Sequence, residues 1–296
     1  MPSLKDIRDR IGSVKNTKKI TSAMKMVAAA KLRRAQMAVE AARPYANKMQ
    51  LVIGELASRV DDDAHPLLIT PEREENILII LVSSDRGLCG GFNSNLFRQL
   101  RRFIADKRQV TSSIKLVTVG RKGFQSFGKS EHLELIKDHE GVMSNVEFDD
   151  AKAIAREAMS MFEAGEVDRV YLVFNEFISA ININQIIRPL LPFEIEESEE
   201  DESANDSGVI SEYIYEPSEA ELLGQLLPNS VEVQVFQAML ESVAAEQGSR
   251  MTAMDNATSN AQDMIDSLTL QYNRARQAYI TKELVEIVSG AESLKG

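Results

Sequence analysis

The sequence predicts an α/β fold combined with a long coiled coil: an antiparallel pair of N- and C-terminal helices flanks a mostly parallel, Rossmann-like α/β domain. Heptad spacing runs through the first 56 residues and again from Met251 to Lys282, and such a seam needs a partner helix. Between these segments, short apolar runs alternate with amphipathic ones, as in parallel sheets covered by helices. Gly and Pro are few, at 15 and 8 of 296 residues, which suits a mainly helical chain.

The N-terminal coiled-coil segment is expected over residues 1–60, with its helix running from Ser3 to about Ser58. Ser3 followed by Asp6 is an N-capping pattern. At about 1.5 Å per residue the helix would be roughly 80 Å long. Pro44 removes one helical hydrogen bond and predicts a kink or a local break. The seam positions are Leu4, Ile7, Ile11, Val14, Lys18, Thr21, Lys25, Ala28, Leu32, Ala35, Val39, Ala42, Ala46, Met49, Ile53 and Leu56.

Three of these seam positions are polar: Lys18, Thr21 and Lys25. Charged groups at core positions weaken a closed two-stranded coil. We therefore expect this stretch to open toward water or another protein.

The α/β domain is expected over residues 75–193. The run Asn76–Val82 is continuously apolar, as in strands buried on both faces. In chain order the expected elements are strand Asn76–Val82, helix Ser94–Lys107, strand Ile114–Val119, a helix or loop at Gly120–Gly128, strand Leu133–Lys137, helix Asp149–Ala164, strand Arg169–Ile178 and an antiparallel strand Asn182–Leu190.

An acidic linker, residues 194–212, is expected after the domain, because it holds nine acids, no base and few apolar residues. The C-terminal coiled-coil segment follows at 213–296. Its helix should start between Pro217 and Val231 and end near Ser289, where Gly290 would stop it. Its seam positions are Met251, Met254, Thr258, Ala261, Ile265, Leu268, Tyr272, Ala275, Tyr279 and Lys282.

Charge is unevenly distributed along the chain. The net charge of −11 argues against a general nucleic-acid binder, yet residues 1–57 carry twelve bases and four acids. This basic helix suits an acidic partner, RNA or an anionic membrane; an acidic partner is favoured because no aromatics interleave the bases. A merely solvated basic face is the alternative. With one cysteine, no long apolar run and no apolar signal region, a reducing, cytoplasmic location is expected.

One loop is of chemical interest, Ser84–Asn93, which follows a buried strand and precedes a helix. Phosphate-binding turns occupy that place in α/β proteins, but its glycines do not match G-x-G-x-x-G and no Walker A pattern occurs. The glycines are alternatively explained by a tight turn. Nothing in the sequence links Cys89 to a histidine as a catalytic pair would require. His132 and His139 lie among acids, but their spacing matches no metal-ligand pattern. We expect no catalytic residue, cofactor or metal.

Three longer motifs mark the chain: Ile11–Lys31, reading IGSVKNTKKITSAMKMVAAAK; Asp85–Gly90, reading DRGLCG; and Ile280–Ala291, reading ITKELVEIVSGA. With these motifs the chain resembles the gamma subunits of bacterial rotary F-type ATP synthases over nearly its full length. The resemblance implies a central rotor stalk, peripheral on the cytoplasmic face of the bacterial inner membrane. The stalk would couple proton transport to ATP synthesis or hydrolysis at the beta subunits, without being catalytic itself.

The resemblance also implies partners and contact residues. The partners would be the alpha and beta subunits, the epsilon subunit and the membrane ring of c subunits, with no nucleic acid and no membrane contact of its own. Met24 would lie near an acidic loop of the beta subunit, and Arg276 and Gln277 near a second beta-subunit loop. Two alternatives stay open: a coiled-coil scaffold or adaptor, and a nucleotide-dependent α/β enzyme with helical arms.

Overall fold

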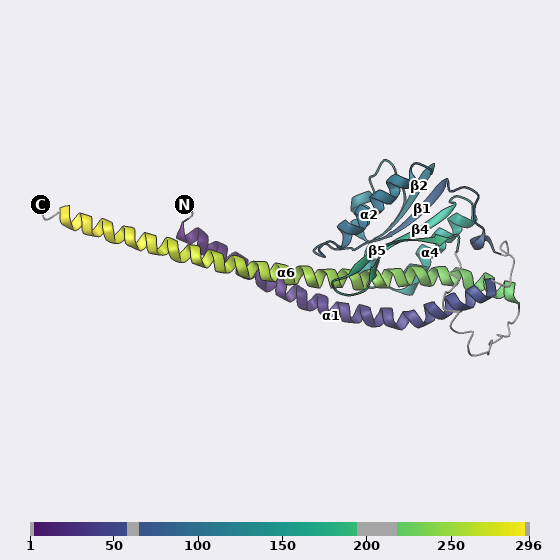
Figure 1. Ribbon diagram of the computed structural model, residues 1–296, viewed down its shortest axis with the longest axis horizontal. Helices are drawn as coiled ribbons and strands as arrows, with labels where there is room; N and C mark the ends of the chain where they lie inside the picture. The colour runs from purple at the N-terminus through teal and green to yellow at the C-terminus, as the bar shows by residue number, and fades with distance from the viewer. Residues whose placement is uncertain (1–2, 58–64, 194–217, 294–296) are drawn as a thin grey trace, which may run out of the picture. The chain divides into compact units, whose positions relative to one another are not determined.

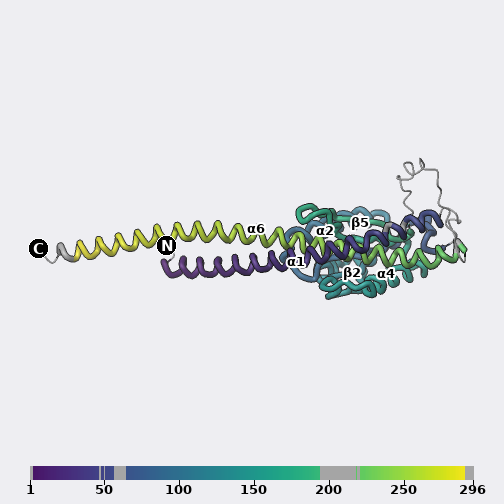
Figure 2. The backbone as a smooth tube through the Cα atoms, turned by 90° about the horizontal axis from the view of Figure 1, so that it is seen from below, coloured from purple at the N-terminus to yellow at the C-terminus, as the bar shows by residue number. Residues whose placement is uncertain are grey.

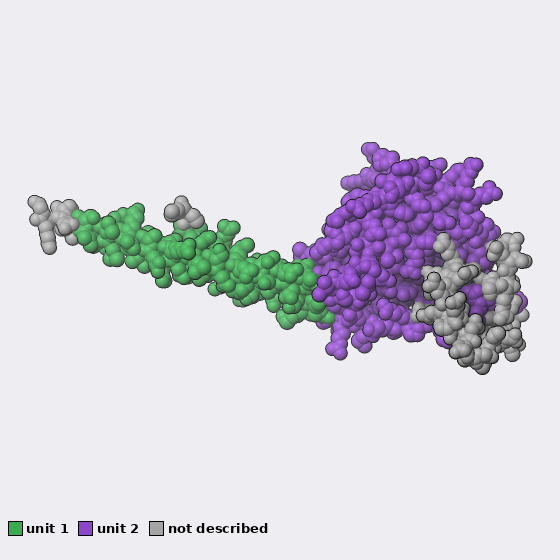
Figure 3. Space-filling view, viewed as in Figure 1, with its two compact units in different colours: residues 1–29, 250–296 green, residues 30–249 purple. Residues whose placement is uncertain are grey.

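The computed structural model describes residues 3–57, 65–193 and 218–293. Two long helices, α1 (Leu4–Ala57) and α6 (Glu219–Ser293), flank an α/β domain in the chain (Figure 1). The chain divides into two compact units, coloured separately in Figure 3. Unit 1 comprises residues 1–29 and 250–296, and unit 2 comprises residues 30–249. Each long helix therefore contributes to both units.

Unit 2 contains a five-stranded sheet with strand order β3-β2-β1-β4-β5. The first four strands are parallel, and β5 pairs antiparallel with β4. The predicted mostly parallel α/β domain and its antiparallel last strand are thus confirmed. The elements are η1 (Pro66–Leu68), β1 (Asn76–Val82), α2 (Phe92–Lys107), β2 (Ser113–Val119), α3 (Arg121–Phe127), β3 (Glu134–His139), η2 (Val142–Ser144), α4 (Phe148–Glu163), β4 (Arg169–Phe177) and β5 (Ile183–Leu191).

Alternate residues of the central strands face two different helical layers, because successive side chains of a strand point to opposite faces. Ile77, Ile79 and Leu81 pack with apolar residues of α2 and α3. Leu78 and Ile80 pack on the opposite face with apolar residues of α4, α1 and α6. The continuous apolar run of β1 is therefore explained by burial on both faces, as the sequence predicts.

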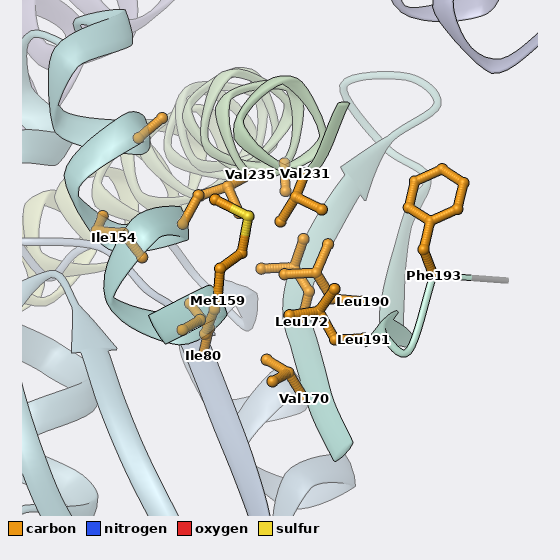
Figure 4. Packing of buried hydrophobic residues seen from close by; sticks show 14 of the residues in the cluster. Ile80, Ile154, Met159, Val170, Leu172, Leu190, Leu191, Phe193, Val231 and Val235 are labelled. Carbon is orange, nitrogen blue, oxygen red and sulfur yellow. The ribbon is translucent and has the colours of Figure 1, made fainter. Parts of the chain in front are cut away.

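The second of these layers brings the long helices into the core of unit 2. Figure 4 shows Val231 and Val235 of α6 meeting Ile154 and Met159 of α4 above strand residues such as Ile80. Such interdigitated apolar packing excludes water and fixes the position of α6 over the sheet within this unit.

Helix α1 begins where the sequence predicts. The Ser3 backbone N–H donates to Asp6 Oδ2 at 3.0 Å, and the Asp6 N–H donates to Ser3 Oγ at 3.2 Å. Hydrogen bonds to the Asp6 carboxyl from the side chain and then from the backbone of Ser3 lower the pKa of that carboxyl. All predicted seam positions from Leu4 to Leu56 are buried or half-buried. Pro44 does not break the helix, which continues through it to Ala57.

Helix α6 begins at Glu219, inside the predicted window, but its predicted end is wrong. It continues through Gly290 to Ser293. Gly290 has no left-handed backbone angle, so it forms no helix-ending cap. A glycine inside a helix costs only about 1 kcal/mol relative to alanine, which a 75-residue helix tolerates. The predicted acidic linker 194–212 lies outside the described residues.

Candidate functional site

In unit 1 the two long helices run side by side and antiparallel (Figures 1 and 2). Three polar contacts join them. Lys18 Nζ donates to Gln262 Oε1 at 2.5 Å, and Lys25 Nζ forms an ion pair with Asp255 Oδ1 at 2.6 Å. We call these contacts, with the threonine pair between them, the polar seam.

The threonine pair of the polar seam is the most buried of the three contacts. Thr258 Oγ1 lies 2.7 Å from Thr21 Oγ1 and 2.7 Å from the carbonyl oxygen of Met254. Thr21 is buried, and its hydroxyl also lies 3.1 Å from the Lys18 carbonyl oxygen. Each hydroxyl therefore has partners, as buried polar groups require.

The predicted opening of this stretch is wrong. Each of the three polar seam residues contacts a side chain of α6 directly; they are Lys18, Thr21 and Lys25. Their partners Gln262 and Asp255 lie next to heptad positions of α6. A prediction from the heptad positions alone leaves out such neighbouring residues. Polar groups at core positions are compatible with a closed coil when every group has a partner.

The polar seam fixes the register of the two helices in unit 1. Residue 18 pairs with 262, 21 with 258 and 25 with 255, so continuing the same register places Leu4 opposite Ala275. Ala275 is the last half-buried residue of α6, and every residue from 276 to 290 is exposed. Helix α6 continues for 18 residues past Ala275, about 27 Å at 1.5 Å per residue. We call residues 276–289 the unpaired end of α6, because no part of α1 lies beside them in this register.

The unpaired end of α6 is rich in exposed apolar side chains. They are Tyr279, Ile280, Leu284, Val285, Ile287 and Val288. Because a helix turns about 100° per residue, Tyr279 and Val285 lie on other sides of the helix than Ile280, Leu284 and Ile287. A helix that is apolar on several sides is typical of a segment surrounded by other protein.

The three residues predicted to contact partners lie in unit 1 but not together. Met24 is half-buried beside the polar seam, next to Lys25. Arg276 and Gln277 are exposed at the start of the unpaired end of α6. The register places Met24 close to Asp255, which is roughly 30 Å along α6 from Arg276. A partner that touches both places must therefore be extended, or must use two separate segments.

The glycine loop Ser84–Asn93 makes a strand-to-helix turn. Leu88 and Gly90 take left-handed backbone angles, with φ of 63° and 57°. Asn93 closes the turn: its Oδ1 accepts from the Ser84 N–H at 3.2 Å, and its Nδ2 donates to Ser84 Oγ at 2.7 Å. The tight-turn explanation of the glycines holds for Gly90, which adopts a left-handed backbone conformation. The exposed Leu88 adopts the same conformation although it is not a glycine.

A carboxylate of the chain itself occupies the carboxyl edge of the sheet. Asp85 Oδ1 accepts from the backbone N–H groups of Arg121 at 3.2 Å and Gly141 at 3.0 Å, and Asp85 Oδ2 lies 3.5 Å from Ser144 Oγ. Doubly wound proteins hold phosphate groups with backbone N–H groups at this edge. Here Asp85 uses those donors, and its negative charge repels a phosphate. The sequence gives no signal for this role.

Cys89, His65 and His139 make structural contacts. Cys89 is buried, and Asn93 Nδ2 donates to its Sγ at 3.4 Å. His65 Nδ1 accepts from the Leu67 N–H at 3.2 Å at the start of η1. His139 Nε2 lies 3.6 Å from Glu157 Oε2, and burial followed by the nearby Lys137 charge lowers the pKa of this imidazole. A basic, charged histidine is therefore disfavoured at His139.

Glu241 is a buried acid in unit 2, beside a cavity of about 70 Å³. Burial raises the pKa of its carboxyl, a hydrogen bond from Gln237 lowers it, and the charge of Glu176 raises it again. Arg43 and Arg188 lower it to a smaller extent. Because a charged carboxylate is costly in such a place, the neutral form of this acid is favoured more than that of a carboxyl in water.

Two further features bear on the alternatives left by the sequence. Among the residues the structure describes, none of the helices is long and apolar enough to cross a bilayer. Within the same ranges, no three or more His, Cys, Asp or Glu side chains group as metal ligands would.

Comparisons of the sequence with a family profile and with individual proteins agree on one family. The ATP synthase family profile matches residues 3–294. The chain is 51% identical to the ATP synthase gamma chains of Anaeromyxobacter sp. (strain K), over 298 residues, and of Geobacter metallireducens, over 296 residues; each alignment covers 100% of both chains.

Solved structures are similar as well. The central stalk and c-ring structure of the Tetrahymena thermophila mitochondrial ATP synthase contains a chain that is 29% identical, with a TM-score of 0.58, over 80% of this chain and 99% of that one. The rotor of the Euglena gracilis mitochondrial enzyme gives a TM-score of 0.65 at 21% identity, over 94% of this chain and 98% of that chain, and shows the shared fold.

Proposed function

The chain belongs to the ATP synthase gamma family, and from that premise we propose how its two helices couple rotation to catalysis in partner subunits. It is the central rotor stalk of the F-type ATP synthase and a non-catalytic subunit of that complex. Its task is to make different contacts at different rotary angles. A contact that differs in free energy between two states shifts the equilibrium between them.

The observation that carries this proposal is the unpaired end of α6. Its exposed apolar side chains lie on several sides of one helix, with no second helix of the described chain in register beside them. A single groove would cover one stripe only, whereas a ring of subunits covers a helix all round. We propose that the alternating alpha and beta subunits surround this segment.

The positions of the predicted contact residues support the proposed contacts with the beta subunits. Arg276 and Gln277 are exposed just past the last half-buried position of α6, so their polar groups are available to a beta-subunit loop. Met24 is half-buried beside the polar seam. A thioether there offers weak, undirected contact to an acidic beta-subunit loop that passes it at every angle.

The other partners are proposed from the family. The epsilon subunit and the ring of c subunits would bind outside unit 1, and the ring would deliver the torque of proton flow. The complex would lie on the cytoplasmic face of the bacterial inner membrane. The Tetrahymena structure, which is that of a central stalk with a c-ring, supports an association of this kind.

Substitution of Met24 tests the coupling role. Met24→Lys adds a cation that bonds an acidic loop at only some angles, and a bond of about 1–3 kcal/mol would slow transit roughly 5- to 150-fold. We expect fewer protons pumped per ATP hydrolysed in inverted membrane vesicles, with unchanged subunit composition. Met24→Leu, which stays apolar, is the control. Equal ratios in wild type and both variants would contradict the proposal for this face.

A second test addresses the unpaired end. Arg276→Ala combined with Gln277→Ala should slow turnover while the complex still assembles, because contacts made at certain angles change the barrier more than the resting state. ATP hydrolysis by the purified complex is the measurement. Normal assembly with full turnover would remove these two residues from the mechanism.

A further inference from the structure

The end of the β4–β5 hairpin contacts α6 directly. Strand β4 pairs with β1 only as far as Val173, whereas its pairing with β5 continues to Phe177. The backbone N–H of Asn175 donates to Ser242 Oγ of α6 at 3.3 Å, and both residues are fully buried. Phe177 packs against a small cluster that includes Ala245 of α6. The last residues of β4 are therefore held by α6 as well as by β5.

The turn of the hairpin approaches α6 at Gly248. A methyl group at residue 248 would lie 3.2 Å from Ala180 Cα and 3.4 Å from Phe177 Cε2. Carbon atoms in an unstrained contact are about 3.5–4.0 Å apart. The hairpin can therefore lie this close to α6 only because residue 248 has no side chain.

The three contact residues of α6 form one row. They are spaced by three residues, so they lie on one side of the helix, each nearly one turn beyond the last. We call them the small-residue track, and they are Ser242, Ala245 and Gly248. The hairpin residues that contact them follow in the same order along the chain. Gly248 is the last contact of the track, and the residues of α6 from Arg250 onward belong to unit 1.

The hairpin is itself well ordered by hydrogen bonds. In its turn, the Ser179 N–H donates to the Asn182 carbonyl oxygen at 2.9 Å, and the Asn182 N–H donates to Ser179 Oγ at 3.0 Å. Across the strands, Asn184 Nδ2 donates to Glu176 Oε2 at 3.3 Å. Two paired strands closed by such a turn resist bending more than a single loop does, so a force on the α/β domain reaches the track through a stiff element.

From these contacts we propose that the hairpin and the small-residue track transmit torque between the α/β domain and α6, with Gly248 as a positioning residue. Other connections lie earlier on α6. The Arg156–Glu232 ion pair, at 2.8 Å, joins α4 to α6, and the apolar core of the α4 side reaches along α6 as far as the half-buried Val243. The inference rests on the rotor role of the chain but not on the contact residues proposed for the beta subunits.

Hydrogen exchange of the full-length chain tests whether Gly248 holds the hairpin in place. In Gly248→Val, the backbone amides of residues 175–182 should exchange about tenfold faster or more, because a crowded contact opens more readily. Gly248→Ala should give a smaller increase and guards against misfolding. Gly224→Val is the matched control, because Gly224 also lies in α6 and its nearest neighbour, His65 Cδ2, leaves room at 3.8 Å. Unchanged exchange in Gly248→Val would overturn the inference.

Torsional stiffness separates torque transmission from a merely structural contact. Without the track, the last core contact of α6 with the α/β domain is Val243, and the stretch of α6 from that contact to Arg276 becomes about a fifth longer. Arg276 marks here only the point where pairing with α1 ends. The torsional stiffness of a rod falls in inverse proportion to its free length. Thermal angular fluctuations of the α/β domain relative to the catalytic head should therefore widen by the same proportion.

The measurement uses the purified complex held by its catalytic head, with a probe on the α/β domain at Lys129→Cys in a Cys89→Ser background. The angular variance at rest should rise by about a fifth or more in Gly248→Val and stay unchanged in Gly224→Val. A merely structural contact would alter the free energy of unfolding but not this variance. Equal variance in Gly248→Val and wild type would thus overturn the inference. Failure of the wild-type probe to rotate during ATP hydrolysis would instead contradict the rotor role itself.

A reversible cross-link provides the rescue. Ala180→Cys combined with Gly248→Cys places two thiols where the backbones are close enough for a disulfide. With Lys129 unchanged and the probe attached through a peptide tag, the reduced form should show a widened variance like that of Gly248→Val. Oxidation should return the variance to the wild-type value and leave ATP-driven rotation intact. A disulfide that stopped rotation would show that the hairpin must move along α6, and would contradict a fixed connection.

Discussion

The same two helices have opposite surroundings in the two units. In unit 2, α6 buries Leu223, Leu227, Val231 and Val235 completely against the α/β domain. In unit 1, α6 pairs with α1 through the polar seam and through buried apolar residues such as Ile265 and Leu268. Beyond Ala275 it continues alone, and its apolar side chains there are exposed. One helix is thus part of a core at one end and exposed at the other, where we propose that partner subunits bind.

The difference locates stability in unit 2 and is consistent with the partner contacts that we propose for the unpaired end of α6. Buried apolar groups give a fold its stability in roughly direct proportion to the area they remove from water. Groups that stay exposed add little until a partner covers them. Substitutions in unit 2 should therefore change the free energy of unfolding, and substitutions at the unpaired end of α6 should change assembly and turnover.

The largest expected effect on folding is that of Leu227→Ala in unit 2. Leu227 has no exposed surface, and a Leu-to-Ala change in a packed core costs about 2–5 kcal/mol. Urea unfolding of the purified chain should show this loss. A cost below about 1 kcal/mol would mean that this part of α6 is not held in the core as the structure describes, and the contrast between the units would fail.

Glu241→Gln should act in the opposite direction, with a smaller effect. Because burial raises the pKa of Glu241, its folded form binds a proton more readily than its unfolded form. Stability is then lost as pH rises from the unfolded pKa through the folded one. The variant removes this dependence, keeps a partner for Gln237, and should add roughly 1–3 kcal/mol at pH 7 and little at pH 4.

The measurement for Glu241 is urea unfolding of wild type and variant across that pH range. The charges facing the carboxyl are Glu176, Arg43 and Arg188. If the two arginines compensate the buried charge fully, Glu241→Gln will not stabilise the chain at pH 7. That result would show that unit 2 contains a balanced ionic cluster at this point and not a purely apolar core.

The sequence predicted the fold better than it predicted the site. The seam of α1 and the apolar run of β1 follow from periodicity, because a buried face imposes its spacing directly on the residues. Periodicity does not predict that Asp255 and Gln262 are the partners of the seam lysines. These two residues flank the seam, and their contacts depend on the register of two segments that are distant in the sequence. The role of Asp85 was also beyond prediction, because its donors at Arg121 and Gly141 come from two other loops.

The end of α6 illustrates a different limit. Glycine frequently ends helices, but the residue type alone does not decide this. Whether Gly290 ends α6 depends on its backbone angles. The three family motifs gave the predicted function, which the comparisons support, while the exposure of the unpaired end depends on where α1 begins in the register. That information is contained in neither helix alone.

The Lys25–Asp255 ion pair gives a smaller effect on folding than the core does. Its side chains are 41% and 58% exposed, so the interaction should contribute at most about 1 kcal/mol. Lys25→Asp should destabilise the chain by about that amount through repulsion with Asp255. Adding Asp255→Lys should restore the loss, and high salt should reduce both effects. A double variant as unstable as the single one would show that the polar seam does not set the register.

Leu284→Ala should have the smallest effect on the chain and a clear one on the complex. Leu284 is 57% exposed in the unpaired end of α6, and substitutions at exposed positions usually change stability by less than about 0.5 kcal/mol. If a ring of subunits surrounds this segment, the lost contact would cost about 1–3 kcal/mol in the assembled state. The chain should then dissociate from the purified complex at lower urea concentration, although its own unfolding is unchanged. Lys282→Ala, in the same exposed segment, is the polar control. A complex as stable with Leu284→Ala as with wild type would mean that this apolar end is not enclosed, and that the contrast between the two ends of α6 is not one of function.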